Sequence, residues 1–316
     1  MNTKNQKKKK KLAILIISNN KDLSPWINSF KEKNKALAIR IYPNIGNPSD
    51  IKMALVWSSN RVDFAQFNNL KCVASMGAGV NHITVNKTIS SEVVITKIID
   101  NDLVYSMWEY LQNAVSNIRL NTYSYIINQS WNQKNIKLKQ DITIGIMGLG
   151  QLGSYVAKKF KDENYIVKGY SNSIKNIEGI KCYKSIQIDD FLANVDVLIN
   201  LMPYTKATKD YFDKEFFCKC KKGLYFINVG RGKSVVDEHL YELINDDFLS
   251  GATLDVFRTE PLPSEHIFYK NSKIIVTPHI ASITNPASVI NQILVNYNNI
   301  LNNNELINKI DRSKDY

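Results

Sequence analysis

The chain has 316 residues, of which 44% are hydrophobic and 22% are charged. This length suits about two globular domains, and the composition excludes wholesale disorder, a collagen-like fibre and a disulfide-stapled miniprotein. The formal net charge is +12, but Lys4 and the lysines at 7–11 supply six of these charges, which leaves +6 for the rest of the chain. A charge of that size does not require a nucleic-acid partner.

The first apolar run, at 12–17, directly follows the N-terminal lysines and could be mistaken for a targeting signal. It is shorter than a secretory core of roughly 7–15 residues or a membrane span of roughly 18, so we interpret it as a buried strand. Four cysteines, Cys72, Cys182, Cys218 and Cys220, are too scattered for a disulfide framework. We therefore expect a soluble, cytoplasmic protein without a membrane partner.

Short apolar runs rich in β-branched residues alternate with polar stretches of helical length. They predict strands at 12–17, 36–41, 53–57, 72–76, 93–97, 142–147, 166–170, 195–201, 224–229, 252–257 and 274–277. Continuous apolar runs suit strands buried on both faces, as in parallel βαβ units. Apolar spacing predicts a linking helix at 103–127 and another helix at 287–306. We expect an α/β protein with two doubly wound parallel-sheet lobes, residues 1–101 plus 287–316 and residues 102–286.

The strand predicted at 142–147 runs directly into a Gly-x-Gly-x-x-Gly sequence and then into a helix. The first glycine allows the tight turn, the second lets the backbone approach a pyrophosphate, and the third lets the helix pack on its strand. Because the strand before and the helix after are both present, we interpret the motif as a dinucleotide site; the alternative is a structural glycine-rich turn. Its predicted cofactor contacts are Gly148, Gly150, Gln151, Leu152 and Gly153.

The next predicted strand ends without the acidic residue that would bind the ribose hydroxyls of NAD. Hydroxyl, amide and lysine groups follow it instead, and these leave room for a 2′-phosphate. We therefore predict a preference for NADP(H), with NAD(H) as a second option; the alternative is an unselective pocket. The residues predicted to contact this part of the cofactor are Ser171, Asn172, Ser173 and Lys175.

Two side chains after predicted strands suit the reduction of a 2-oxo acid. That reaction needs a cation to hold the carboxylate and polarise the carbonyl, and an acid to protonate the new alkoxide. Arg231 lies between two glycines after the strand at 224–229, and His279 follows Pro278 after the strand at 274–277. Ligands of open α/β sheets bind outside the carboxyl ends of strands, so we expect both in the active site. We interpret His82, His239 and His266 as loop or surface residues.

Two other features do not predict a partner. Cys218 and Cys220 are too closely spaced for a zinc knuckle and no second pair supports one, so we expect no metal. The N-terminal lysines lack interleaved aromatic residues and a binding fold, so we interpret them as a solvated tail and expect no nucleic acid.

Four blocks of the sequence, in order, resemble the D-isomer-specific 2-hydroxyacid dehydrogenase family. They are the glycine fingerprint, Asn228-Val-Gly-Arg-Gly, Leu254-Asp-Val-Phe-x-x-Glu-Pro-Leu-Pro and Thr277-Pro-His. Within the family the chain is most similar to the glyoxylate/hydroxypyruvate reductase A branch, through Ala54-Leu-Val-Trp57, Met76-Gly-Ala-Gly-Val80 and Met107-Trp-Glu-Tyr110. Asn172 stands where that branch leads us to expect an arginine.

The resemblance implies a Rossmann dinucleotide-binding domain at 102–286, a flavodoxin-like substrate-binding domain from the rest, and a homodimer formed through the cofactor lobe. It implies that Arg231 grips the 2-oxo acid, that His279 is the general acid, and that Glu260 orients and charges His279. The residues that it implies line the cofactor are Met202, Pro203, Val229, Gly230 and Asp255, the last positioning the nicotinamide carboxamide. The substrate residues that it implies are Gly77, Ala78 and Gly79, whose amides bind the carboxylate, and Trp57 and Met76, which close a small pocket. Without the resemblance, Glu260 reads as a loop acid and Trp57 as a core aromatic.

A small pocket favours glyoxylate and hydroxypyruvate as substrates, reduced to glycolate and D-glycerate with NADPH. One alternative is a dehydrogenase for another 2-oxo acid, such as pyruvate. Another is a nicotinamide-sensing module that binds a partner protein; the presence of Arg231, Glu260 and His279 together argues against it, because a sensor need not keep all three.

Overall fold

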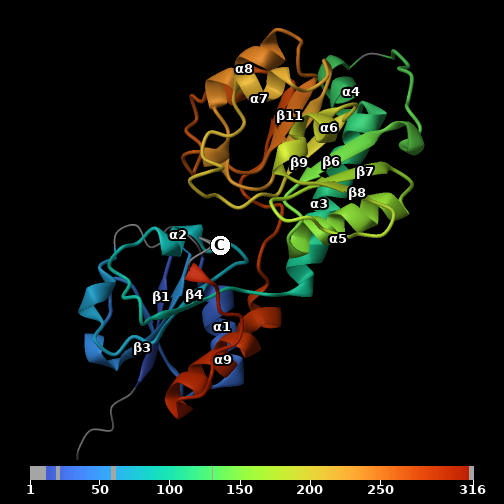
Figure 1. Cartoon of the computed structure of the whole chain (residues 1–316). Coiled ribbons are helices and arrows are strands. Elements are labelled where there is room, and N and C mark those ends of the chain that lie inside the picture. Colours follow the sequence, from blue (N-terminus) through green and yellow to red (C-terminus); the bar gives the residue numbers. More distant parts are fainter. Residues whose placement is uncertain (1–11, 19–21, 58–61, 130, 313–316) are drawn as a thin grey trace, which may run out of the picture. The chain divides into compact units, whose positions relative to one another are not determined.

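The computed structural model describes residues 12–18, 22–57, 62–129 and 131–312, so the N-terminal lysines lie outside the described residues. The chain divides into two compact units, which we call the first unit (Met1–Leu103 with Thr284–Tyr316) and the second unit (Val104–Ile283) (Figure 1). The observed divisions follow residues 103 and 283, and the expected ones followed residues 101 and 286.

The first unit is built on a five-stranded parallel sheet in the order β2-β1-β3-β4-β5, which is the flavodoxin-like order. Its strands are β1 (Ala13–Ile17), β2 (Ala38–Ile41), β3 (Ile51–Val56), β4 (Cys72–Ser75) and β5 (Val94–Thr96), and its helices include α1 (Ser24–Lys33), α2 (Asn81–Thr84) and α9 (Pro286–Asn302). Along β1, alternate side chains enter two separate apolar clusters, one on each face of the sheet. Two-sided burial explains why the strand is apolar throughout.

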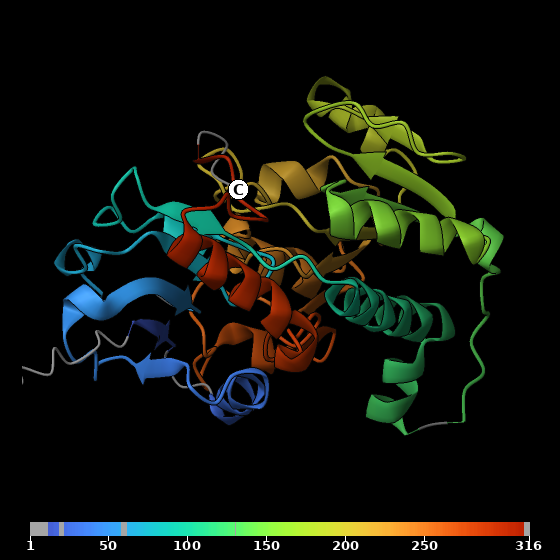
Figure 2. The same cartoon turned by 90° about the horizontal axis from the view of Figure 1, so that it is seen from below.

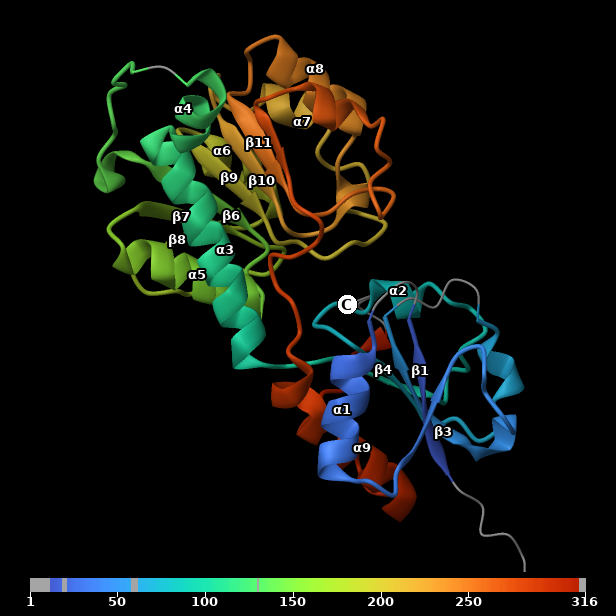
Figure 3. The same ribbon diagram turned by 180° about the vertical axis from the view of Figure 1, so that it is seen from behind.

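Helices α1 and α9 lie side by side on one face of this sheet, although they come from opposite ends of the chain (Figures 2 and 3). Helix α9 begins where the side chain of Asn285 accepts a hydrogen bond from the amide of Ala287 and Pro286 takes the first position. It ends at Asn302, and the next residue, Asn303, is left-handed with a φ of +56°. The C-terminal segment is thereby built into the N-terminal unit.

The second unit is built on a seven-stranded parallel sheet in the order β12-β11-β10-β9-β6-β7-β8, which is the Rossmann order with one added strand. Its strands are β6 (Thr143–Met147), β7 (Ile166–Tyr170), β8 (Lys181–Tyr183), β9 (Val197–Asn200), β10 (Tyr225–Asn228), β11 (Gly251–Leu254) and β12 (Ile274–Val276). Its helices include α4 (Thr122–Asn128), α5 (Gln151–Asp162), α6 (Ile188–Leu192), α7 (Lys214–Cys218) and α8 (Asp237–Asn245). Helix α3 (Asn101–Leu120) starts in the first unit and continues into the second.

Helices cover both faces of this second sheet. Helices α3 and α5 pack on one face through a cluster that contains Trp108, Leu111 and Phe160 (Figure 3). Helices α6, α7 and α8 pack on the other face, through a cluster that contains Phe191 and Phe217. Short 3-10 helices lie at Pro48–Asp50, Phe64–Gln66, Lys139–Asp141, Ser185–Gln187, Gly232–Ser234 and Ile267–Lys270.

The structure confirms the fold class and corrects three elements. Strand β8 was not predicted, because Lys-Cys-Tyr at the sheet edge carries no apolar run. The single helix expected at 103–127 is wrong, since α3 ends at Leu120 and Asn121 turns left-handed with a φ of +56° before α4 begins. The tail helix expected to reach 306 ends at Asn302.

Within the described part of the chain, we find no helix with the length and apolar content needed to cross a bilayer. Because every strand pairing in both sheets is parallel, all strands of a sheet end at the same edge. That edge is where side chains from distant parts of the sequence meet.

Candidate active site

The turn after β6 contains the glycine fingerprint. Gly148 has a φ of +102°, and a Cβ there would lie 2.7 Å from the carbonyl carbon of Leu201, so the position requires glycine. A Cβ at Gly153 would lie 1.9 Å from the carbonyl oxygen of Gly148. At Gly150, by contrast, a Cβ would meet no atom of the described residues within 4 Å. Packing within the protein therefore explains two of the glycines and leaves Gly150 unexplained.

Helix α5 starts at Gln151 directly after this turn, followed by Leu152. Its N-cap, Gly150, supplies no side-chain hydrogen bond to the first-turn amides. Uncapped amides and the positive end of the helix dipole favour a bound anion at this end. The turn and the helix start together form a phosphate-binding geometry.

The loop after β7 contains Ser171, Asn172, Ser173 and Lys175, of which all but the half-buried Ser171 are exposed. The Ser171 hydroxyl donates to the carbonyl of Ser173 at 2.6 Å, which holds the start of the loop in a turn. No aspartate or glutamate occurs between 171 and 177. The loop therefore presents hydroxyl, amide and ammonium groups with no carboxylate of its own.

A buried asparagine pair, which the sequence analysis missed, supports the ends of β9 and β10. Asn200 donates to the side-chain oxygen of Asn228 at 2.9 Å, and both residues are at most 1% exposed. Asn200 also accepts from the amide of Met202, the residue before Pro203, and Asn228 accepts from the amide of Gly230, the residue after Val229. The pair therefore fixes the backbone of the residues expected to line the cofactor. Its only sequence signal is an asparagine at the end of each of two apolar strands.

Arg231 follows β10 and is half-buried. Its guanidinium Nη1 donates to the carbonyl of Gly230 at 2.6 Å, while its own carbonyl accepts from the hydroxyl of Ser234 at 2.6 Å. Ser234 in turn accepts from Asn200. The Arg231 turn is thus anchored to the asparagine pair.

His279 and Glu260 form a direct pair at the ends of β12 and β11. The Nδ1 atom of His279 lies 2.8 Å from Oε2 of Glu260, and Oε1 of Glu260 accepts from the amide of Phe257 at 2.9 Å. Their side chains are 34% and 37% exposed, so the pair is held in place and still reaches solvent. Because the carboxylate accepts, Nδ1 carries the hydrogen and Nε2 is the nitrogen that can exchange a proton with a ligand.

The opposite charges of Glu260 and Arg231 affect each other's pKa. Burial raises the pKa of Glu260, but the hydrogen bond and charge of His279, the Phe257 amide and the charge of Arg231 outweigh it, so the pKa lies below its ordinary value of 4.5. Burial lowers the pKa of Arg231, and attraction to Glu260 opposes that change. Arg231, Glu260 and His279 follow the neighbouring strands β10, β11 and β12, so the sheet brings the three together.

Asp255 follows β11 and is 1% exposed. Its carboxylate accepts hydrogen bonds from the hydroxyl of Thr277 and from the amides of Ile280 and Ala281. Burial raises the pKa of Asp255, against the effect of these three donors. The residue expected to position the nicotinamide is therefore already engaged by the turn that contains His279.

The substrate residues expected in the first unit follow its neighbouring strands β3 and β4. Trp57 comes after β3, and its ring centroid lies 6.3 Å from that of His82. After β4, Met76 is buried and the hydroxyl of Ser75 bridges the loop: it donates to the carbonyl of Gly79 at 2.6 Å and accepts from the amide of Gly77 at 3.1 Å. Ala78 lies between these two bonds. A Cβ at Gly77 would lie 3.3 Å from the Trp57 ring, so the loop passes close to it.

The remaining histidines lie apart from the His279 pair. His239, on α8, accepts from the amide of Lys214, and His266 caps a 3-10 helix and contacts Asp237. Among the residues that the structure describes, no group of three or more His, Cys, Asp or Glu side chains could hold a metal ion.

A Rossmann sheet whose edge carries a glycine turn, an arginine and a histidine–carboxylate pair defines a nicotinamide-dependent oxidoreductase. Comparison with known proteins gives the family. The model for the D-isomer-specific 2-hydroxyacid dehydrogenase NAD-binding domain matches residues 111–281. Glyoxylate/hydroxypyruvate reductase A of Serratia proteamaculans is 32% identical over 281 residues, 86% of this chain and 89% of that protein.

Solved structures agree. A D-isomer-specific 2-hydroxyacid dehydrogenase of Xanthobacter autotrophicus, in complex with NADPH and MES, matches with a TM-score of 0.88 and 27% identity, over 97% of this chain and all of that one. An NADPH-dependent glyoxylate/hydroxypyruvate reductase of Sinorhizobium meliloti, in complex with NADP and sulfate, has a TM-score of 0.88 and 26% identity, over 96% of this chain and all of that one. The chain belongs to the D-isomer-specific 2-hydroxyacid dehydrogenase family, as the sequence motifs predicted.

Proposed function

We propose that the protein reduces small 2-oxo acids with NADPH, converting glyoxylate to glycolate and hydroxypyruvate to D-glycerate. The observation that carries the proposal is the 2.8 Å contact between Nδ1 of His279 and Oε2 of Glu260. The charge of Arg231 helps to lower the pKa of that glutamate. Two of the relatives named above, those of Serratia proteamaculans and Sinorhizobium meliloti, are 32% and 26% identical and have this activity in their names, which supports the reaction class and favours these two substrates.

In the proposed mechanism NADPH supplies the hydride, and the residues of this chain bind and protonate the substrate. The guanidinium of Arg231 holds the 2-oxo acid and polarises its carbonyl, because a planar fork can contact two oxygens at once. The Nε2 atom of protonated His279 donates a proton to the oxygen of that carbonyl as it becomes a hydroxyl. Glu260 fixes the ring through Nδ1 and stabilises its positive charge.

The proposal includes a preference for NADP(H). The uncapped start of α5 and the open position at Gly150 suit a pyrophosphate, and the 171–175 loop has no carboxylate to repel a 2′-phosphate. Asn172 and Lys175, in place of an arginine, would contact that phosphate. Relatives solved with NADPH or NADP support this choice.

The cofactor site has a direct test in two glycine substitutions. Gly150→Ala should fold with an unchanged thermal midpoint and bind NADPH at least about tenfold more weakly, because only a ligand needs that space. Gly153→Ala should fail to fold normally, because its Cβ would overlap the Gly148 carbonyl. Unchanged NADPH affinity in Gly150→Ala would place the pyrophosphate elsewhere.

For the substrate, we propose that the loop after β4 binds the carboxylate. The Gly77 amide already donates to Ser75, so this contact falls mainly on the amides of Ala78 and Gly79. The adjacent Trp57 and Met76 limit the size of the substrate to two or three carbons. Trp57→Ala should then raise the specificity constant for bulkier 2-oxo acids relative to glyoxylate.

The deciding experiment is a steady-state panel that crosses NADH and NADPH with glyoxylate, hydroxypyruvate and pyruvate. The highest kcat/KM should come from NADPH with glyoxylate or hydroxypyruvate. A clear advantage for pyruvate or a bulkier acid would favour another dehydrogenase of the family, and an advantage for NADH would reject the cofactor preference. Tight NADPH binding without turnover on any 2-oxo acid would favour the nicotinamide-sensing alternative.

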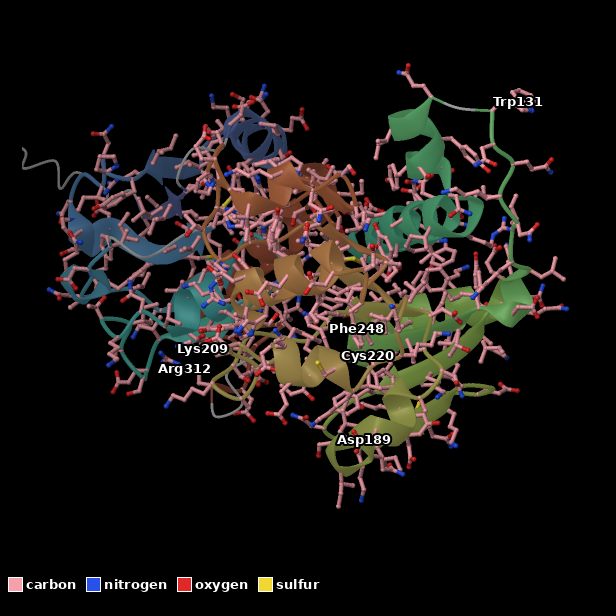
Figure 4. All side chains as sticks on the ribbon, turned by 90° about the horizontal axis from the view of Figure 1, so that it is seen from above. Trp131, Asp189, Lys209, Cys220, Phe248 and Arg312 are labelled. Carbon is pink, nitrogen blue, oxygen red and sulfur yellow. The ribbon has the colours of Figure 1, made fainter. Side chains whose placement is uncertain are left out.

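We also propose a homodimer formed through the second unit. Apolar side chains on α4 and the segment that follows it are exposed, including Ile126 at 63%, Trp131 at 104% and Leu138 at 60%. Figure 4 shows Trp131 projecting from that segment away from the rest of the unit. Light scattering should give twice the monomer mass, and Trp131→Ser together with Ile126→Ser should shift it towards the monomer.

The four cysteines are all free thiols, which suits the reduced cytoplasm that we propose as the compartment.

A further inference from the structure

The turn that contains His279 has an unusual backbone conformation. His279 has a φ of +56°, in the left-handed region that non-glycine residues seldom adopt. Its amide donates to the carbonyl of Thr277 at 3.0 Å across Pro278. A strained residue persists only where its surroundings hold it, so the contacts on either side of His279 decide where its ring points.

Asp255 holds both sides of this turn. Before His279, the Thr277 hydroxyl donates to Oδ1 of Asp255 at 2.6 Å; after it, the amides of Ile280 and Ala281 donate to Oδ1 and Oδ2 at 2.8 and 2.9 Å. With three donors bound to one buried carboxylate, the backbone on both sides of His279 is fixed to the end of β11.

Tyr110 extends this arrangement from helix α3. Its hydroxyl lies 2.6 Å from Oγ1 of Thr277. A threonine hydroxyl has one hydrogen to donate, and Thr277 gives it to Asp255, so the Tyr110 phenol is the donor to Thr277. Burial raises the pKa of Tyr110 well above its ordinary value, so the phenol keeps that hydrogen. The hydrogen bonds therefore run in one direction, from Tyr110 through Thr277 to Asp255.

We propose that Tyr110 and Thr277 are positioning residues for the proton donor: they orient the Asp255 carboxylate, which holds His279 in its left-handed conformation with Nδ1 on Glu260. The inference rests on the proposed role of His279. It adds two hydroxyl groups, one from a helix at the start of the second unit, to the residues on which the reaction depends.

The test compares Tyr110→Phe, Thr277→Val and Thr277→Ser with a matched control, Tyr225→Phe. The Tyr225 hydroxyl lies 3.0 Å from Oγ1 of Thr253, so it forms a tyrosine–threonine pair in the same unit with no bond to the His279 turn. Each variant is measured for kcat, for the KM of NADPH and glyoxylate, for thermal midpoint, and for the imidazole ¹⁵N signals of His279, assigned with His279→Gln.

We expect kcat to fall about tenfold in Tyr110→Phe and further in Thr277→Val, with the KM for NADPH within about twofold of the original, because a misplaced acid affects the chemical step. Thr277→Ser keeps the hydroxyl and should restore kcat, and Tyr225→Phe should match the original enzyme. The His279 Nδ1 signal should change in Tyr110→Phe and Thr277→Val only.

Equal kcat in Tyr110→Phe and Tyr225→Phe, with an unchanged His279 signal, would overturn the inference, as would a loss in Thr277→Val that serine does not restore. If the original enzyme reduces no 2-oxo acid, the proposed function fails. The ¹⁵N signals, which need no turnover, then still decide whether the two hydroxyls orient His279.

Discussion

The second unit contains two histidine–carboxylate pairs that differ in almost every physical respect. In one, His279 Nδ1 lies 2.8 Å from Glu260, and both side chains are about one third exposed. In the other, His266 Nε2 lies 3.4 Å from Asp237, and the side chains are 21% and 10% exposed. The first lies at strand ends beside Arg231, whereas the second joins a loop to the first turn of α8.

The environments give the two carboxyl groups opposite shifts. The pKa of Glu260 lies below its ordinary value, because its hydrogen bonds and the charges of His279 and Arg231 outweigh burial. Burial raises the pKa of Asp237 to about 6, despite the nearby charge of Arg258. Burial also lowers the pKa of His266, whose Nδ1 accepts from the Phe268 amide. A histidine and a carboxylic acid therefore meet in both places, but the carboxyl group has a lowered pKa beside Arg231 in one and a raised pKa in a more buried contact in the other.

The largest expected effect is a difference in kcat between variants of His279 and His266. His279→Gln should lower kcat for glyoxylate reduction by about 10²–10⁴-fold, because the proton donor is removed, while NADPH still binds. His266→Gln should keep kcat within about twofold, since its contacts are with a 3-10 helix and Asp237. Steady-state kinetics and NADPH fluorescence titration measure both. A near-normal rate in His279→Gln would remove that residue from the mechanism.

A smaller effect is expected at the carboxylates. Glu260→Gln should lower kcat about 10- to 100-fold, because the ring keeps a hydrogen-bond acceptor and loses the charge that stabilises its protonated form. Asp237→Asn should leave kcat nearly unchanged. If both amide variants lose activity equally, the distinction between a reacting pair and a structural pair is wrong.

The last prediction concerns stability and no change in the reaction rate, and it involves Asp237. A raised folded-state pKa means that the folded state binds more protons than the unfolded state between pH 4 and 6, so this group's contribution to stability falls as the pH rises through that window. The unfolding free energy of Asp237→Asn minus that of the original protein should therefore rise by about 2–3 kcal/mol as the pH increases from 4 to 6.5. Urea unfolding at several pH values measures this difference; parallel curves would contradict the buried-carboxyl description.

Local sequence patterns were sufficient to predict that Arg231 and His279 lie at the ends of buried strands. Both follow apolar runs that mark buried strands, and parallel sheets gather strand ends at one edge. The contact between Glu260 and His279 was not available from the residues alone, because a glutamate before a proline also suits an ordinary loop; only the family resemblance assigned it a partner.

Other features had no local signal. The Asn200–Asn228 pair depends on the register of β9 against β10, and the His266–Asp237 pair depends on the path of a loop past α8. Strand β8 is short and polar, and it forms because β7 offers an open edge. These features follow from tertiary contacts that composition and periodicity do not encode.

The left-handed conformation of His279 has an evolutionary consequence. The amides of Ile280 and Ala281, which follow it, donate to Asp255, so these two contacts hold its backbone without involving the imidazole. Asparagine adopts left-handed conformations readily, and a single base change converts a histidine codon into an asparagine codon. Under the proposed mechanism, one nucleotide therefore separates this dehydrogenase from a descendant that we expect to fold and bind its dinucleotide without turnover, which is a short route from a metabolic enzyme to a sensor of redox state.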